Sequence, residues 1–135
     1  MVETLNHDQE HLKLLSIFHY VLSGIVALFA CFPIIHLIIG IMFIVSPEAM
    51  ADKSGNAPPP FFGWMFAIIG GMMVLAGWIL AIFLLFSGRF LARKKHYVFC
   101  LAVACLSCLF APLGTVLGVF TIIVLIRPSV KELFV

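Results

Sequence analysis

Apolar residues run along most of this chain in long blocks, and polar residues gather in short stretches between them. The blocks are continuous rather than alternating, which favours helices in an apolar surrounding over half-exposed strands. The pattern predicts an all-α protein with polar tails over 1–11 and 127–135. Between the tails lie three apolar tracts and the two polar stretches that separate them: 12–46, 47–60, 61–87, 88–96 and 97–126.

The middle tract is short enough to be a single helix. Its 27 residues rise about 40 Å, which exceeds the roughly 30 Å hydrocarbon core of a bilayer and allows for tilt. Pro58, Pro59 and Pro60 precede it, and prolines are accepted at a helix start although they interrupt a helix interior. The sequence therefore predicts one transmembrane helix over 61–87.

The first and third tracts are too long to cross a bilayer as straight helices. They hold 35 and 30 residues, which would rise roughly 52 and 45 Å. Each carries a proline near its middle, and Pro112 is followed by Gly114, which strengthens the turn signal. We expect a helix break at Pro33 and another at Pro112 and Gly114.

The two long tracts also resemble each other. His19-Tyr20-Val21 recurs as His96-Tyr97-Val98, and twelve residues after each histidine comes a cysteine, Cys31 or Cys108. Such self-similarity predicts an internal duplication. The expected fold is an all-α polytopic integral membrane protein, a helical bundle in which a duplicated proline-broken segment flanks one central transmembrane helix.

Two topologies are compatible with this duplication. Kinked single spans would give three spans with parallel copies, whereas hairpins would give five membrane segments with inverted copies. The basic residues of 88–96 place that loop in the cytoplasm in both cases. Hairpins put six basic residues inside and two outside, against five and three for single spans, and are therefore preferred. Their short arms would have to be re-entrant, tilted or sheltered by protein.

Composition excludes several classes of protein. Hydrophobic residues make up 64% of the chain and charged residues only 10%, whereas soluble domains need about a quarter, so a water-soluble globule is excluded. A formal net charge of +2 leaves no basic surface for nucleic acid. The acidic segment Met1–Glu10 is unlike the basic start of a cleaved signal peptide.

One face of the middle tract consists mostly of small residues. They recur in alternating steps of four and three, which is the spacing of a heptad seam. Small residues let helix backbones approach closely, and such contact drives helix association in lipid. The seam predicts packing against a helix of the same chain or of another subunit. Its members are Gly63, Ala67, Gly70, Val74, Gly77, Ala81, Leu84 and Gly88.

Histidines are the first candidates for a cofactor site. His19, His36 and His96 lie in or beside the apolar tracts, where ionisable groups are rare, and could ligate haem, a pigment or a metal ion. The alternative is a structural imidazole satisfied by neighbouring carbonyls and hydroxyls. His7 and His11, one helical turn apart in the N-terminal tail, could bind a divalent metal ion or simply face solvent.

Four cysteines offer thiol chemistry. Cys105 and Cys108 form a CxxC pair, while Cys31 and Cys100 stand alone. Thiolates are favoured by cationic neighbours or a helix N-terminus, but Cys31, Cys105 and Cys108 have apolar neighbours and are expected near a helix C-terminal end. Cys100 lies four residues after His96, and the two could ligate a metal ion but form only half of a site. We therefore favour small buried residues that pack helices over a membrane thiol oxidoreductase.

The interiors of the tracts hold no Asp, Glu, Lys or Arg, and Lys13 at the edge of the first tract is the only charged residue within their bounds. Coupled transporters normally need carboxylates or unwound ion sites inside the membrane, so a driven transporter is disfavoured. Passive conduction past helix ends and backbone carbonyls needs no charged side chain and stays open.

The end of the chain resembles that of many small bacterial inner-membrane proteins with no assigned activity. The resemblance rests on Pro112-Leu113-Gly114-Thr115 with Gly118, and on Arg127-Pro128-Ser129-Val130 after an apolar run. Phe18-His19-Tyr20-Val21 and Cys31-Phe32-Pro33 fit the same group. The resemblance implies a multi-pass protein of the bacterial inner membrane and implies no catalysis.

The sequence predicts a non-enzymatic role. The expected protein is a membrane-embedded structural, assembly or accessory subunit, or a homo-oligomer, whose partners are the lipid bilayer and other membrane subunits. The first alternative is a membrane protein that binds haem, a pigment or a metal ion through His19, His36 or His96. The second is a small oligomeric channel built from inverted re-entrant hairpins.

Overall fold

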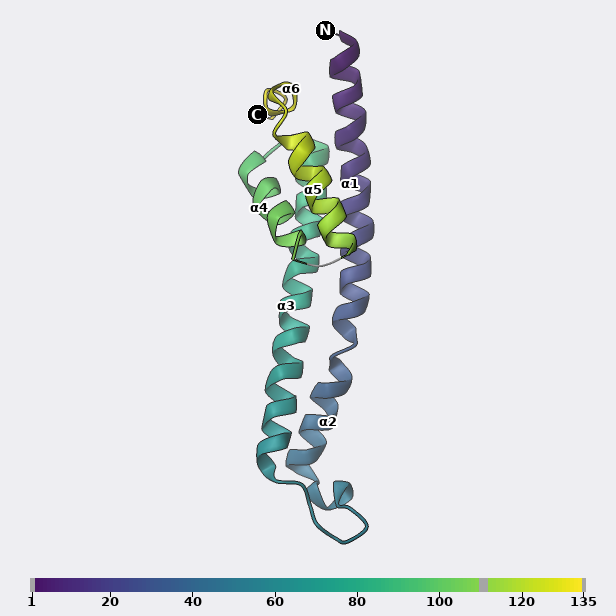
Figure 1. Ribbon diagram of the computed structural model, residues 1–135, viewed down its shortest axis with the longest axis vertical. Coiled ribbons are helices and arrows are strands. Elements are labelled where there is room, and N and C mark those ends of the chain that lie inside the picture. The colour runs from purple at the N-terminus through teal and green to yellow at the C-terminus, as the bar shows by residue number, and fades with distance from the viewer. Residues whose placement is uncertain (1, 110–111, 135) are drawn as a thin grey trace. The chain divides into compact units, whose positions relative to one another are not determined.

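A computed structural model describes residues 2–109 and 112–134, and the described residues are helices joined by short turns, with no strand among them (Figure 1). The predicted all-α class is confirmed. In chain order the elements are α1 (Val2–Cys31), α2 (Ile34–Val45), the 3₁₀ helix η1 (Pro47–Met50), α3 (Pro60–Arg93), α4 (Tyr97–Ser107), α5 (Leu113–Leu125) and α6 (Pro128–Lys131).

The chain divides into two compact units, and the boundary falls within both long helices. Unit 2 is the continuous segment Val26–Ile79, and it contains the end of α1, all of α2 and η1, and the first part of α3. Unit 1 joins Met1–Ile25 to Leu80–Val135, so it combines most of α1 with the end of α3 and with α4, α5 and α6.

Unit 2 is held together by direct backbone contact between α2 and α3. Gly40 is buried against the backbone of Ala67 and Gly63, and a methyl group built on Gly70 would lie 2.8 Å from the amide nitrogen of Leu37. Ala30, near the end of α1, fits against Gly77 in the same manner. Side chains would hold these helices apart, so the small residues set the spacing.

Pro33 bends the first tract without reversing it. Its backbone stays in the right-handed helical region (φ −67°, ψ −8°), and the amide of Leu37 donates to its carbonyl at 3.1 Å. The helical path therefore runs with one interruption from Asn6 to Val45. The preferred hairpin for this tract is wrong, because only two residues, Phe32 and Pro33, lie between α1 and α2, too few to reverse the chain.

The third tract does form a hairpin. A methyl group on Gly118 of α5 would lie 2.5 Å from the carbonyl oxygen of Ala104 on α4, so the two backbones touch. Across the break, the Thr115 hydroxyl donates to the Cys108 carbonyl at 2.8 Å. Helix α4 ends at Ser107 and α5 begins at Leu113, so the helix is interrupted before Pro112, although residues 110 and 111 lie outside the described residues. The expected break at Gly114 is wrong, because Gly114 is a helical residue of α5.

The two similar tracts therefore take different shapes. Three residues separate Cys108 from Pro112, but only one separates Cys31 from Pro33. After the break, Gly118 closes on the preceding helix of its own tract, whereas Gly40 faces α3 instead. The inverted pair of hairpins that would have built a channel is not formed, since only one tract folds back.

Helix α3 is longer than the sequence indicated. It continues through Arg93, so the predicted basic loop 88–96 consists mainly of the last turns of a helix and shrinks to Lys94–His96. The expected polar tail 1–11 is likewise helical from Val2 onward. Polar residues end an apolar tract without ending a helix, because the backbone hydrogen bonds of a helix lie within the helix itself.

Two helical segments are long and apolar enough to cross a membrane, by length and composition. They are Asn6–Val45, with 40 residues, and Pro60–Arg93, with 34 residues. Helices α4 and α5 are apolar too, but their 11 and 13 residues rise only about 16 and 20 Å, less than a hydrocarbon core.

Two adjacent glycines of α3 provide a matched test of the packing in unit 2. We expect Gly70→Ala to lower the free energy of unfolding by about 1–3 kcal/mol, because its methyl group would meet the α2 backbone. At Gly71 a methyl group would meet only the flexible end of Leu37 at 3.7 Å, so Gly71→Ala should be neutral or mildly stabilising. The unfolding free energies of both variants can be measured by following the loss of helical structure as a denaturing detergent is added. Equal losses would contradict the packing described.

Candidate functional site

Unit 1 has polar side chains in its interior. Ser16, His19 and Ser23 follow one face of α1, and each is at most 5% exposed. Ser87 on α3 and Thr121 on α5 have no exposed surface. In a helical bundle this apolar, buried polar groups need partners, and their hydrogen bonds show what the cluster does.

Two of these serines link α1 to α3. The Ser16 hydroxyl donates to the Gly88 carbonyl, and the Ser23 hydroxyl donates to the Ala81 carbonyl, both at 2.7 Å. The donors are seven residues apart on one helix, and so are the acceptors on the other. The pair therefore sets the register of two antiparallel helices at two consecutive heptads.

His19 lies between the two serines and is only half satisfied. Its Nδ1 is 2.9 Å from the Leu15 carbonyl oxygen, which can only accept, so Nδ1 donates. In the neutral ring Nε2 is then an acceptor. Nε2 is buried and has no hydrogen-bond partner among the described residues, and the same is true of the Ser87 hydroxyl.

The remaining buried hydroxyls bond within their own helices. Ser107 donates to the Val103 carbonyl at 2.8 Å, and Thr121 donates to the Leu117 carbonyl at 2.7 Å. These bonds satisfy each hydroxyl locally and leave no reactive group exposed. Sequence reasoning singled out His19 and passed over the serines around it. The spacing of 16, 19 and 23 on an apolar helix was the signal that could have found them.

The other two candidate histidines are exposed and are not part of this cluster. His36 in unit 2 stacks on Phe66, with ring centroids 6.2 Å apart. His96 in unit 1 packs on Phe90 at 4.7 Å. His19 differs from both because it has no exposed surface. A haem could not reach its Nε2 unless the helices separated.

Metal ligands do not gather in the described part of the chain, where no three His, Cys, Asp or Glu residues lie together. His7 is exposed on α1, with its Nδ1 4.0 Å from a Glu10 carboxylate oxygen, and His11 is exposed on the same helix. The predicted pair thus lies on a solvent-facing turn with one carboxylate nearby.

The cysteines are all free thiols. Cys108 ends α4, as the sequence indicated, and its thiol faces the Ala104 carbonyl at 3.3 Å. Cys31 bonds the Ala27 carbonyl at 3.4 Å, and the buried Cys100 thiol reaches the Ser87 carbonyl at 3.8 Å. In these contacts the S–H donates to a backbone carbonyl. Cys105 is exposed on the apolar α4, and Cys31 is exposed at the end of α1, so the expectation of small buried residues is wrong for these two.

The small-residue seam of α3 is its inward face. Gly63 and Gly70 contact α2, Gly77 contacts Ala30 of α1, and in unit 1 a methyl group on Gly88 would lie 3.1 Å from the His19 Cβ. Ala81 and Leu84 are buried in unit 1 as well. The sequence leaves open whether the seam packs against a helix of the same chain or of another subunit; the contacts described above are within the chain.

A buried carboxylate ties the two ends of the chain together in unit 1. Asp8 on α1 is only 5% exposed, and it accepts a 2.6 Å hydrogen bond from the Ser129 hydroxyl. Arg127 approaches its other oxygen at 3.5 Å. A charge-assisted bond of this kind is among the stronger polar contacts, and it holds α6 beside α1. The sequence offered no signal for it, because 121 positions separate the partners.

No family model matches this chain, and no curated protein or solved structure matches it either.

The contribution of the Ser16 and Ser23 hydrogen bonds to stability can be measured, with the unpartnered Ser87 hydroxyl as the comparison. Ser16→Ala and Ser23→Ala each remove an interhelical hydrogen bond, and each should cost about 0.6–1.7 kcal/mol of unfolding free energy. Ser87→Ala removes a buried hydroxyl that has no partner among the described residues, so it should be neutral or stabilising. Detergent unfolding titrations compare the three. A loss at Ser87 equal to the others would show that its hydroxyl is bonded.

Proposed function

We propose that this chain is an integral membrane protein with a structural or accessory role, not an enzyme. The observation that carries the membrane assignment is the exposure of its most apolar helices. Only 11% of the most apolar stretch of Asn6–Val45, and 22% of that of Pro60–Arg93, is buried by the chain. A core helix of a soluble protein would be mostly buried, and large exposed apolar surfaces mark contact with lipid or protein.

The proposed topology has two crossings and one re-entrant hairpin. The α1–α2 segment crosses the bilayer, α3 crosses back, and α4–α5 dips in and returns. Seven of the eight Lys and Arg residues belong to unit 1, and only Lys53 lies in the loop between α2 and α3. The positive-inside rule therefore puts Lys94–His96 and both termini in the cytoplasm, with the α2–α3 loop outside. A bacterial inner membrane is the location proposed.

Fractionation and labelling test this topology. The protein should stay in the membrane pellet after alkaline carbonate washing and should dissolve in mild detergent. On intact spheroplasts, an impermeant maleimide should label Ser54→Cys at once, but Lys95→Cys only after permeabilisation, with the native cysteines replaced. Both positions are exposed in polar stretches. Labelling of both on intact cells, or recovery of the protein from plain buffer, would refute the proposal.

The structural role is supported by how the side chains are used. The inward faces are occupied by glycine contacts and by hydroxyls bonded to backbone carbonyls, which hold helices in place. The outward faces present large apolar side chains on every long helix, including Phe29 (70% exposed), Met72 (66%) and Phe120 (61%). Such faces suit lipid and the helices of other subunits. Because the seam is used internally, any oligomer would form through these outward faces.

Site-directed photo-crosslinking in the membrane tests the accessory role. A photoreactive residue at Phe29, Met72 or Phe120 should give a discrete protein adduct from at least one position, either with a second copy or with another subunit. The same group at Ser54, in the polar loop, is the matched control and should give none. Adducts with lipid alone at all three apolar positions would contradict the role.

The alternative function, binding of haem, a pigment or a metal ion, rests on the unpartnered Nε2 of His19. The Nδ1 hydrogen bond to the Leu15 carbonyl leaves Nε2 as the nitrogen that could act as a ligand. Burial opposes it, because the atom is closed off within unit 1. A visible absorption band or bound metal in the purified protein would favour this rival over the structural role.

A further inference from the structure

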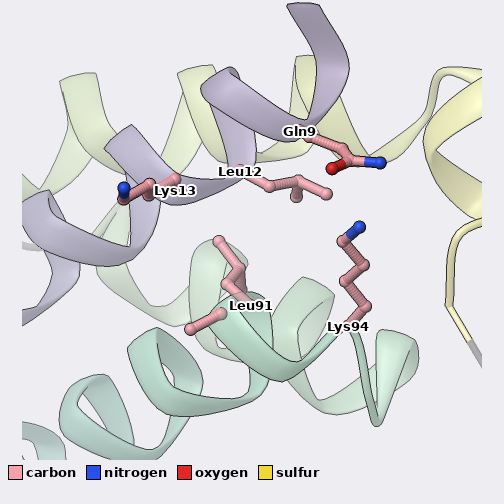
Figure 2. Close-up of a pocket in the computed structure, with 6 residues that line it drawn as sticks. Gln9, Leu12, Lys13, Leu91 and Lys94 are labelled. Atoms are coloured by element: carbon pink, nitrogen blue, oxygen red, sulfur yellow. The ribbon is translucent and has the colours of Figure 1, made fainter. Parts of the chain in front are cut away.

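A groove runs between α1 and α3 in unit 1, at the end where α3 stops. Gln9, Leu12 and Lys13 line it from α1, and Leu91, Ala92 and Lys94 line it from the end of α3. Figure 2 shows Leu12 and Leu91 facing each other across the groove, the Lys94 amine extending toward the Gln9 amide, and Lys13 on the other side of Leu12. Two cations thus flank an apolar floor.

Neither lysine has an acidic partner among the described residues. The carboxylate of Asp8 bonds Ser129 and Arg127, and Glu10 lies beside His7. No ion pair of the described chain includes Lys13 or Lys94. The positive charge of the groove is therefore available to an external anion, and Gln9 adds an amide donor beside it.

The backbone holds Lys94 in a conformation that lysine rarely adopts. Its φ is 52°, in the left-handed region that glycine favours at this position. The Lys95 amide donates to the Phe90 carbonyl at 3.0 Å, and the Lys94 amide donates to the Leu91 carbonyl at 3.3 Å. These two bonds form a Schellman motif with Lys94 where glycine is usual. A cation thus stands at the groove although glycine would fit the turn with less strain.

We propose that this groove binds the headgroup of an anionic phospholipid. The inference rests on the proposed membrane insertion, which puts the groove at headgroup depth, because Lys13 begins one apolar segment and Lys94 follows another. The phosphate oxygens accept from the Lys94 amine and the Gln9 amide, and Lys13 adds a second cation. Leu12 and Leu91 are buried beneath the headgroup and close the groove toward the core, so the lipid contacts the groove at its polar rim. Basic pockets between membrane helices commonly take such lipids.

Lipid titrations of the detergent-purified protein, with bound lipid counted by native mass spectrometry, test the proposal. Phosphatidylglycerol should bind more tightly than phosphatidylcholine. Lys13→Gln and Lys94→Gly should each weaken phosphatidylglycerol binding about fivefold. Lys94→Arg keeps the charge and should retain binding. Lys95→Gln is the matched control, because Lys95 is adjacent and exposed but does not line the groove, and it should leave binding within about twofold.

Lys94→Gly also separates binding from folding. Glycine relieves the left-handed backbone, so this variant should unfold at the same or a higher detergent concentration while it loses lipid. If Lys94→Gly keeps both its stability and its lipid binding, the proposal that the groove binds a phospholipid headgroup is refuted.

Three further results would also refute it: equal weakening by Lys95→Gln, equal binding of phosphatidylcholine, or occupancy by inorganic phosphate as tight as by the lipid. The membrane proposal fails on a different result, recovery of the protein without detergent.

Discussion

Close contact between helix backbones is the constraint on which both units depend. In the membrane that we propose surrounds these helices, lipid offers no hydrophobic drive for association, so van der Waals contact and interhelical hydrogen bonds must supply it. Helix α3 meets this requirement with one small-residue face. In unit 2 that face touches the backbone of α2 at Gly40 and Gly70, and in unit 1 Gly88 lets α1 approach. The α4–α5 hairpin repeats the device at Gly118, where the backbones of its two arms touch.

The close approach of the α1 and α3 backbones also determines which polar side chains can form hydrogen bonds between the two helices. Once α1 and α3 are this near, the carbonyls of Ala81 and Gly88 come within reach of Ser23 and Ser16, and the two hydroxyl bonds add register to proximity. His19 sits between them with one nitrogen bonded and the other not. That acceptor and the Ser87 hydroxyl are the two buried polar groups of the cluster without a partner among the described residues. His19 has no exposed surface, so an external molecule could reach its Nε2 only if the helices separated.

The charged residues lie outside the most apolar parts of the helices. Asp8, Arg127 and Ser129 join the two ends of the chain, and Tyr97 adds a bond to the Leu125 carbonyl at 3.1 Å. In the same unit, Lys13 of the groove lies on α1 five residues after Asp8, and Lys94 directly follows α3. A bundle with apolar outward faces and a cationic rim is suited to the boundary between hydrocarbon and phosphate, which links the proposed topology to the proposed lipid site.

The sequence by itself determined the all-α class, the limits of the apolar tracts, the inward face of α3 and the two proline breaks. These are local matters, since periodicity and proline geometry act over a few residues. Only the tertiary structure decided that Pro33 bends its tract while the tract of Pro112 folds back. Both prolines lie in the right-handed region, and the path of the chain after each one depends on which surface the next glycine meets. The contacts of Asp8 with Ser129 and Arg127, and the groove lined by Lys13 and Lys94, could not be predicted from the sequence, because both join residues that only folding brings together.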